Sequence, residues 1–279
     1  MKVSVIVTLY KDIEAISLIL DALKKQTYKN FEVIIAEDDN ALETRRFLES
    51  YTGLDIKHVA HPDIGRTKTV IQNKAVSISE GDYLIFIDGD IIPYSTFIEA
   101  QILVAKPKRV MSGRRVHLTP ELSQKIRQGK LSVKKLEKYF FFYALLLIFD
   151  KEARVEQGIY INPKGWIYKL FLSKRKRNAN IIGCNWSCYK EDFIRINGFD
   201  ESYGFSCLGD DTDLDWRFKA SGCESFSSKN IANVFHLYHK HNDAQPTTEV
   251  PPEVKLMRDR EKEGAFVATK GLDTHLNGC

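Results

Sequence analysis

Residues 82–91 read Asp-Tyr-Leu-Ile-Phe-Ile-Asp-Gly-Asp-Ile, and this stretch decides the fold prediction. Its apolar centre, entered through Gly81 and left through an acidic turn, is typical of a central strand buried on both faces of a sheet. Open α/β sheets bind ligands at the carboxyl ends of such strands. Asp88 and Asp90 repel each other in a tight turn, so one interpretation is a magnesium or manganese site. The other interpretation is a solvated Asp-Gly turn, which any isolated Asp-Gly-Asp sequence allows.

Three similar apolar segments precede this strand, and each is followed by a helical pattern. We expect these strands at residues 3–9, 31–36 and 56–60. Their alternation with helices predicts a doubly wound sheet with right-handed crossovers. The second strand also ends in acidic residues, Glu37 and Asp38. Residues 1–110 are therefore expected to form a nucleotide-binding half.

The rest of the chain is expected to form a second half, residues 111–242, and a polar tail, residues 243–279. Further strands are expected at 109–118, 181–189 and 231–238. Residues 119–178 form a basic and aromatic insertion with no clear periodicity. The tail turns polar after Pro246, so we expect it to be loosely attached.

The composition is that of a globular protein with a mild basic excess. Hydrophobic residues make up 43% of the chain, charged residues 28%, and the formal net charge is +4. No apolar run approaches the ~20 residues that span a bilayer, and the first residues lack the pattern of a secretory signal. Five irregularly spaced cysteines indicate free thiols. We therefore expect a cytoplasmic protein.

One segment of the insertion suggests a surface interaction. The apolar residues Trp166–Leu172 are followed directly by four basic residues, Lys174–Arg177. Such a segment can lie on an anionic membrane surface. A solvated loop is the alternative, and a nucleic-acid patch lacks any accompanying binding motif.

A second acidic cluster contains four aspartates within six residues, from Asp210 to Asp215. Negative side chains are favoured at a helix N-terminus, so capping could explain one or two of them. The remainder favour a catalytic role, since a carboxylate held at a helix start suits a general base.

Two histidines, His236 and His239, lie at the end of the last expected strand. On a continuing strand they would point to opposite faces, so at most one is expected to enter a given pocket. Imidazole beside aspartate is compatible with manganese or zinc, and an exposed strand-end histidine is the alternative. Cys184 and Cys188 would be ~13 Å apart on a strand, which excludes a shared structural zinc.

Five sequence blocks occur in the order seen in family-2 inverting glycosyltransferases of the GT-A fold, and the chain resembles this family over residues 3 to 242. The blocks are 5–10 (VIVTLY), 32–38 (EVIIAED), 82–90 (DYLIFIDGD), 197–201 (NGFDE) and 209–214 (GDDTDL). The later blocks also resemble β-1,4-galactosyltransferases and chondroitin-type polymerases. The resemblance implies a mixed, mostly parallel sheet with helices on both faces, in a single compact domain with a C-terminal acceptor-binding portion.

The chain departs from these relatives in three places. Asp210 stands where glutamate is usual, and Glu37-Asp38 stands where many relatives have two aspartates. The Gln-x-x-Arg-Trp motif of processive synthases is missing. The last departure argues against a processive polysaccharide synthase.

The resemblance also implies roles for individual residues. The nucleotide-sugar site would contain Thr8, Tyr10, Asp38, Arg66, Lys74 and Asp88. The divalent ion would be bound by Asp90 and by Asp88, which would touch the ribose or the metal, with His236 or, as second choice, His239 as a further ligand. Asp211 would be the catalytic base, and Asp210 would bind the acceptor. Trp186 would be a sugar-stacking platform, although a buried tryptophan is the simpler interpretation.

The activity implied is non-processive, inverting transfer of a hexose or N-acetylhexosamine from a UDP-sugar to a glycan or lipid-linked saccharide. Such enzymes use Mn²⁺ or Mg²⁺ and build bacterial surface polysaccharide or lipopolysaccharide. Contact with an anionic membrane at the inner face of the plasma membrane is expected, and nucleic acid is not expected as a partner. A metal-dependent nucleotidyltransferase and a catalytically silent sugar-binding subunit remain as alternatives.

Overall fold

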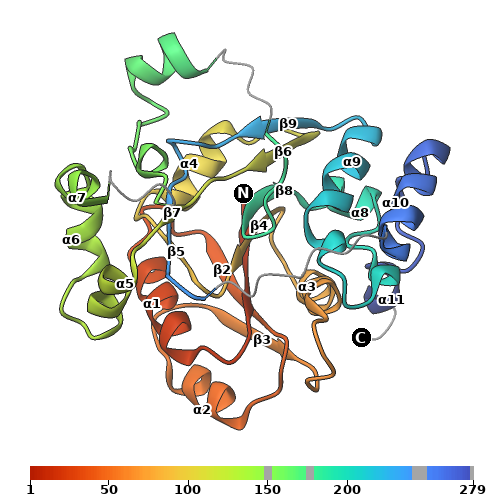
Figure 1. Cartoon of the computed structure of the whole chain (residues 1–279), viewed down its shortest axis with the longest axis horizontal. Helices are drawn as coiled ribbons and strands as arrows, with labels where there is room; N and C mark the ends of the chain where they lie inside the picture. The colour runs from red at the N-terminus through yellow and green to blue at the C-terminus, as the bar shows by residue number, and fades with distance from the viewer. Residues whose placement is uncertain (148–152, 174–178, 241–249, 277–279) are drawn as a thin grey trace.

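A seven-stranded sheet with the strand order β3-β2-β1-β4-β8-β6-β9 forms the centre of the computed structural model (Figure 1). The structure describes residues 1–147, 153–173, 179–240 and 250–276. The sheet strands are β1 (Val3–Leu9), β2 (Phe31–Glu37), β3 (Ile56–Ala60), β4 (Tyr83–Asp88), β6 (Arg109–Ser112), β8 (Asn185–Tyr189) and β9 (Glu224–Ser227). β1 to β4 are mutually parallel, whereas β8 is antiparallel to β4 and β6. The predicted mixed, mostly parallel sheet is confirmed.

Helices cover both faces of this sheet because successive strand residues point to opposite sides. Val5 and Val7 of β1 enter one hydrophobic cluster, and Ile6 enters the other. The first four helices are α1 (Ile13–Lys24), α2 (Leu42–Ser50), α3 (Lys68–Ser77) and α4 (Phe97–Val104). α1 and α4 pack on the first face and α3 packs on the second. The apolar run of residues 83–87 is fully buried, as its sequence predicts.

A small second sheet follows the Asp88-Gly89-Asp90 turn. It consists of β5 (Ile91–Pro93), β10 (Val234–His236) and β7 (Val116–His117), in the order β5-β10-β7. The strand predicted at 109–118 is therefore two strands, and the one predicted at 231–238 has only three residues. His236 is registered with Ile91 on one side and with His117 on the other. This pairing brings the end of the last strand beside the acidic turn.

The insertion forms several short helices. They are α5 (Pro120–Arg127), α6 (Val133–Lys138), α7 (Phe140–Leu147), the 3₁₀ turn η1 (Val155–Gln157) and the π-helical turn η2 (Tyr168–Leu172). Of these, α5, α6 and α7 lie at the left edge of Figure 1. Thr119 and Ser132 cap α5 and α6 through their side chains. The basic run 174–177 lies outside the described residues. Within the described part of the chain, no helix has the length and apolar character that crossing a bilayer requires.

The C-terminal elements lie over the second face of the sheet. They are α8 (Lys190–Arg195), the 3₁₀ turns η3 (Glu201–Tyr203) and η4 (Cys207–Asp210), α9 (Thr212–Ala220), α10 (Pro252–Glu263) and α11 (Asp273–Leu276). Helices α8 and α9 pack on the sheet directly, and α10 packs against α9. The prediction of a loosely attached tail is wrong for residues 250–276. Leu272 is buried in the core, and the guanidinium of Arg260 pairs with the buried Asp200. A few apolar and charged contacts therefore hold this segment against the rest of the protein, although its average composition is polar.

Candidate active site at the carboxyl edge of the sheet

A cavity of about 620 Å³ opens at the carboxyl ends of β1, β2 and β4. Parallel strands end together at this edge, and Thr8 of β1 is registered directly with Asp88 of β4. Predicted site residues that line the cavity are Thr8, Tyr10, Asp38, Arg66, Asp88, Asp90 and His239. The edge predicted from the strand order is therefore the place where these side chains meet.

Asp90 and the two histidines form a cluster with the geometry of a metal site. The Nε2 atoms of His236 and His239 lie 3.0 Å and 3.2 Å from Asp90 Oδ2. One ligand atom from each of the three residues lies within 4.8 Å of the others. Both histidines approach Asp90, but of the two only His239 lines the cavity, as the prediction of one histidine per pocket expects. The expected strand alternation does not extend to His239, because β10 ends at His236.

The residues present fit a divalent cation. Asp90 Oδ1 is buried and accepts no hydrogen bond from any described residue, so it can bind an ion. Burial raises the pKa of Asp90, but hydrogen bonds to His236 and His239 outweigh burial and hold the pKa below its ordinary value. A carboxylate with two imidazoles suits Mn²⁺ or Zn²⁺ better than Mg²⁺, which prefers oxygen ligands.

His117 of β7 lies behind this cluster and was missed in the sequence. Its Nδ1 atom lies 3.1 Å from Nδ1 of His236, and the two rings meet edge to face. A partner on the second ring nitrogen orients a histidine ligand and fixes its tautomer. No local pattern marks this role, since β7 has only two residues and its partner is distant in the chain.

Lys68, the first residue of α3, is the most important residue that sequence reasoning missed. Its Nζ atom lies 2.8 Å from Asp88 Oδ1 and 3.2 Å from Asp210 Oδ2. Burial lowers the pKa of Lys68, but attraction to these two carboxylates outweighs burial and raises it, so the ammonium stays protonated. Lys74, the lysine predicted from the sequence, is in the last turn of α3 and does not line the cavity.

Asp210 and Asp211 differ sharply in their surroundings. Asp210 is buried and also accepts from Nη2 of Arg66 at 2.9 Å, in addition to its pairing with Lys68. Asp211 is half-buried at the start of α9, where its side chain accepts only from the Thr212 hydroxyl and makes no capping bond. In the described part of the chain, no lysine or arginine pairs with Asp211. The capping explanation therefore fails for Asp211, whose carboxylate is available to accept a proton.

The other two aspartates of this cluster are structural. Asp213 is fully buried against Arg217, and Asp215 accepts from the backbone N–H of Ile181 and pairs with Lys219. Of the four aspartates, Asp210 and Asp211 therefore remain candidates for the site, whereas Asp213 and Asp215 stabilise the helix α9 that follows them.

Asp38 is held in a fixed orientation at the base of the cavity. Oδ1 lies 2.7 Å from His61 Nε2 and accepts from the Thr67 hydroxyl at 2.6 Å, and Oδ2 accepts from the Thr67 backbone N–H at 3.0 Å. Nearby, Thr8 accepts from Gln72 at 2.9 Å. Tyr10 is 55% exposed at the rim, where the Lys11 ammonium lies 4.7 Å from its ring centroid. His61, Thr67 and Gln72 were not identified from the sequence.

Trp186 belongs to the core. It has 0% exposure and stacks on Phe86 with a ring-centroid distance of 4.2 Å. Trp186 and Phe86 are directly registered in the antiparallel β8–β4 pair, so their side chains lie on the same inner face. The prediction of a sugar-stacking platform is wrong, because no surface of the indole reaches the solvent.

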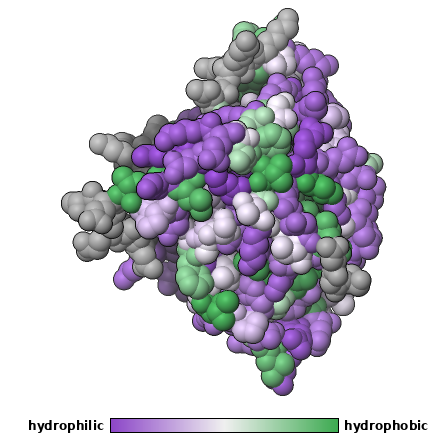
Figure 2. Space-filling model, turned by 90° about the vertical axis from the view of Figure 1, so that its right-hand side faces the viewer, coloured by the Kyte–Doolittle hydropathy of each residue, from purple (hydrophilic) through white to green (hydrophobic). Residues whose placement is uncertain are grey.

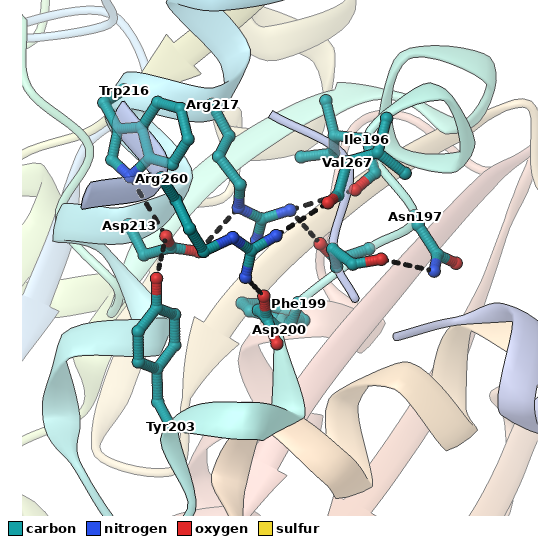
Figure 3. A network of polar contacts seen from close by, with 12 residues as sticks. Ile196, Asn197, Phe199, Asp200, Tyr203, Asp213, Trp216, Arg217, Arg260 and Val267 are labelled. Atoms are coloured by element: carbon teal, nitrogen blue, oxygen red, sulfur yellow. Dashed lines mark hydrogen bonds and ion pairs between the residues drawn. The ribbon is translucent and has the colours of Figure 1, made fainter. Parts of the chain in front are cut away.

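A buried polar network fixes the loop that carries Asp210 and Asp211 (Figure 3). Arg217 of α9 pairs with Asp213 and donates to the backbone carbonyls of Ile196 and Gly198 at 3.0 and 2.8 Å. Tyr203 and the indole of Trp216 donate to the second oxygen of Asp213. Figure 3 also shows Arg260 of α10 reaching the same region, where it pairs with Asp200. The Asn-Gly-Phe-Asp block is thus part of the scaffold that holds α9.

Replacing Arg217 with methionine is expected to lower the free energy of unfolding by about 3 kcal/mol, because it leaves Asp213 buried without its cation. Urea denaturation measures this change. The matched control is Lys219→Met in the same helix, whose partly exposed pair with Asp215 should contribute under about 1 kcal/mol. Equal losses in the two variants would show that the buried network does not stabilise this region.

The chain matches known sugar-transferring proteins in three independent ways. A family model described as glycosyl transferase family 2 matches residues 4–196, and one described as the N-terminal domain of galactosyltransferase matches residues 170–240. The amylovoran biosynthesis glycosyltransferase AmsB of Erwinia amylovora is 36% identical over 94 residues, covering 31% of this chain and 30% of AmsB. WfgD of Escherichia coli, a UDP-Glc:alpha-D-GlcNAc-diphosphoundecaprenol beta-1,3-glucosyltransferase, is 24% identical over 214 residues, covering 71% of this chain and 81% of WfgD.

Solved structures support the same fold. The mannosyltransferase PcManGT of Pyrobaculum calidifontis, solved with GDP-Man and Mn²⁺, aligns with a TM-score of 0.54 and 18% identity, covering 86% of this chain and 58% of that chain. The sheet, its acidic carboxyl edge and these likenesses define a glycosyltransferase of the GT-A fold. Since the first family model covers more than half of the residues, the chain belongs to glycosyl transferase family 2.

Proposed function

We propose that the protein transfers a hexose or N-acetylhexosamine from a UDP-sugar to a saccharide acceptor, with inversion at the anomeric carbon. The observation that carries this proposal is the cluster of Asp90, His236 and His239, of which Asp90 and His239 line the same cavity as Asp38 and Asp88. A nucleotide pocket beside a candidate cation site is what a donor with a diphosphate requires. WfgD, which carries UDP-Glc in its name, is similar along most of the chain.

In this proposal the donor lies across the carboxyl ends of β1, β2 and β4. Asp38 would accept from the uracil ring, Thr8 and Tyr10 would line the uridine pocket, and Asp88 would contact the ribose. Arg66 and Lys68 add positive charge on the side of the cavity nearest Asp210. Asp90, His236 and His239 would hold Mn²⁺ or Mg²⁺, which when bound offsets charge on the departing diphosphate.

Asp211 would act as the general base for the acceptor hydroxyl. It is the aspartate of the second cluster that lacks a cationic partner among the described residues, and it stands at the start of a helix held by the Arg217 network. Deprotonation of the hydroxyl as it attacks opposite the leaving group is a single displacement, which inverts the anomeric configuration. Asp210, held by Arg66 and Lys68, would bind the acceptor from the next position.

We propose a lipid-linked or oligosaccharide acceptor used in non-processive surface polysaccharide synthesis. WfgD acts on a diphosphoundecaprenol-linked sugar by its name, and AmsB is named for amylovoran biosynthesis. Trp166, Leu170 and Phe171 are each at least 65% exposed, which supports peripheral contact with an anionic membrane. Serine in place of all three should reduce flotation with anionic vesicles, and unchanged flotation would exclude contact through this segment.

A thermal-shift screen of nucleotide sugars with and without Mn²⁺ tests the donor class. A UDP-sugar should raise the melting temperature in the presence of Mn²⁺, because a ligand stabilises the folded state that binds it. A shift with nucleoside triphosphates alone, together with release of pyrophosphate, would favour the nucleotidyltransferase alternative. No shift with any nucleotide sugar would favour a catalytically silent subunit.

Lys68→Met is expected to weaken UDP-sugar binding about tenfold, since it removes a buried cation from between Asp88 and Asp210 and leaves the cavity more negative toward a diphosphate. Isothermal titration calorimetry measures the dissociation constant. Lys74→Met is the matched control in the same helix and should bind the donor as the parent protein does. If the two variants bind equally well, Lys68 has no part in the donor site.

A further inference from the structure

A second and larger cavity, of about 1190 Å³, lies between α1 and the insertion. Its walls are predominantly apolar, with Leu18 and Ala22 from α1, Ile126 from α5, and Phe140 and Ala144 from α7. Small-molecule pockets typically occupy about 300–1,000 Å³. This cavity is therefore large enough to hold an extended apolar ligand.

The cavity is continuous with an exposed apolar surface on α7. Phe141 and Leu145 line the cavity and are also 71% and 54% exposed, and the neighbouring Phe142 is 65% exposed. Large apolar side chains gathered at a cavity mouth mark a binding surface more strongly than isolated exposed residues do. An apolar ligand could thus pass from outside the protein into the cavity without crossing polar surface.

The cavity is also lined by three lysines, Lys25, Lys134 and Lys138, which make no ion pair with any carboxylate of the described residues. Three carboxylates line it as well, of which Glu156 pairs with Lys229. Asp21 and Glu137 accept only from the neutral groups of Tyr51 and Ser95 among the described residues, so they keep their negative charge. Three lysines without an ion pair therefore face two such carboxylates, and this small positive excess suits a single anionic group.

The insertion presents this surface at one edge of the molecule, opposite α9, α10 and α11 (Figure 1). The face over those C-terminal helices is mainly hydrophilic, with only scattered apolar residues (Figure 2). The exposed apolar residues of α7 therefore lie on the side of the molecule away from this hydrophilic face. With the lysines of α6, they resemble the pairing of basic and aromatic residues found where proteins contact anionic lipids.

We propose that this cavity binds a single anionic lipid, with its hydrocarbon chain between α1 and α7 and its phosphate group beside Lys25, Lys134 and Lys138. The chain of a lipid has no polar groups, which matches the apolar walls, whereas a peptide would bring backbone groups that need partners. The site is separate from the donor cavity. Helix α5 lies between the two cavities: its residue Ile126 lines the lipid site, and the next residue, Arg127, lines the donor site.

This proposal does not depend on the proposed sugar transfer, and direct binding to the purified full chain tests it. Calorimetry with dodecyl phosphate below its critical micelle concentration should show saturable binding to one site. Dodecyl maltoside should bind at least about tenfold more weakly because it lacks the charge. Decyl phosphate should bind about fifteenfold more weakly, because it is two methylenes shorter and each buried methylene is worth about fourfold. Inorganic phosphate alone should not bind.

Two variants separate the lipid site from general adhesion. Ala144→Trp should fill the cavity and abolish binding of dodecyl phosphate. The pair Lys134→Gln and Lys138→Gln should weaken that binding about tenfold while leaving dodecyl maltoside unaffected, and it keeps the test valid if the tryptophan variant does not fold. The matched control, Lys255→Gln with Lys262→Gln on α10, should bind as the parent protein does. Equal weakening by the control pair, binding of phosphate alone, or preference for an apolar peptide would overturn the proposal.

Discussion

Asp211→Asn is expected to lower the rate of sugar transfer by about a thousandfold, within the range that a general base contributes. The variant keeps the size and hydrogen-bonding capacity of the side chain but cannot accept the acceptor's proton. Among the described residues the Asp211 side chain accepts a hydrogen bond only from Thr212 and makes no ion pair, so its substitution should leave the scaffold unchanged. Donor affinity should therefore stay within about twofold of the parent value. Rapid-quench single-turnover kinetics and calorimetry with the UDP-sugar measure the two quantities.

Asp215→Asn is the matched control for this substitution. It lies in the same helix, and its side chain accepts from the Ile181 backbone N–H, which asparagine can still satisfy. The control should transfer sugar within a few-fold of the parent rate. If Asp211→Asn lost donor binding and transfer equally, Asp211 would be a structural residue and the general-base assignment would fail.

Asp90→Asn is expected to lower the affinity for Mn²⁺ by more than about a hundredfold, because it removes the anionic ligand of the cluster while both histidines remain. Electron paramagnetic resonance of free Mn²⁺ reports this change without any turnover. Transfer activity should fall in parallel, since the departing diphosphate would lose its counter-charge. Asp63→Asn, at a nearby exposed pair with Lys11, is the control and should bind Mn²⁺ normally. Unchanged Mn²⁺ binding in Asp90→Asn would place the metal elsewhere.

The central part of the fold could be predicted because its signals are local. Residues 83–87 form an apolar run that only a strand covered on both faces can bury, and β4 has these bounds to within one residue. The repeated strand and helix pattern gave the parallel order of the first four strands. Acidic strand ends then placed Asp38, Asp88 and Asp90 at one edge, since the carboxyl ends of parallel strands meet there.

The failures have physical causes that the local pattern does not contain. His236 and His239 both reach Asp90 because a three-residue strand ends between them, and the length of β10 is set by pairing with β5 and β7. Lys68 was passed over for Lys74 because the first residue of α3 became clear only in the structure. Trp186 is buried because it is registered with Phe86 across the sheet, a contact between residues a hundred positions apart.

The most direct test of the central claim is to follow one UDP-sugar turnover by nuclear magnetic resonance, in the presence of Mn²⁺ and a saccharide acceptor. With an α-linked donor, the account predicts a β-linked product and one free UDP for each sugar transferred. The Asp211→Asn variant should form neither. An α-linked product would contradict single displacement with Asp211 as base, and release of uridine monophosphate or pyrophosphate would contradict sugar transfer from this cavity.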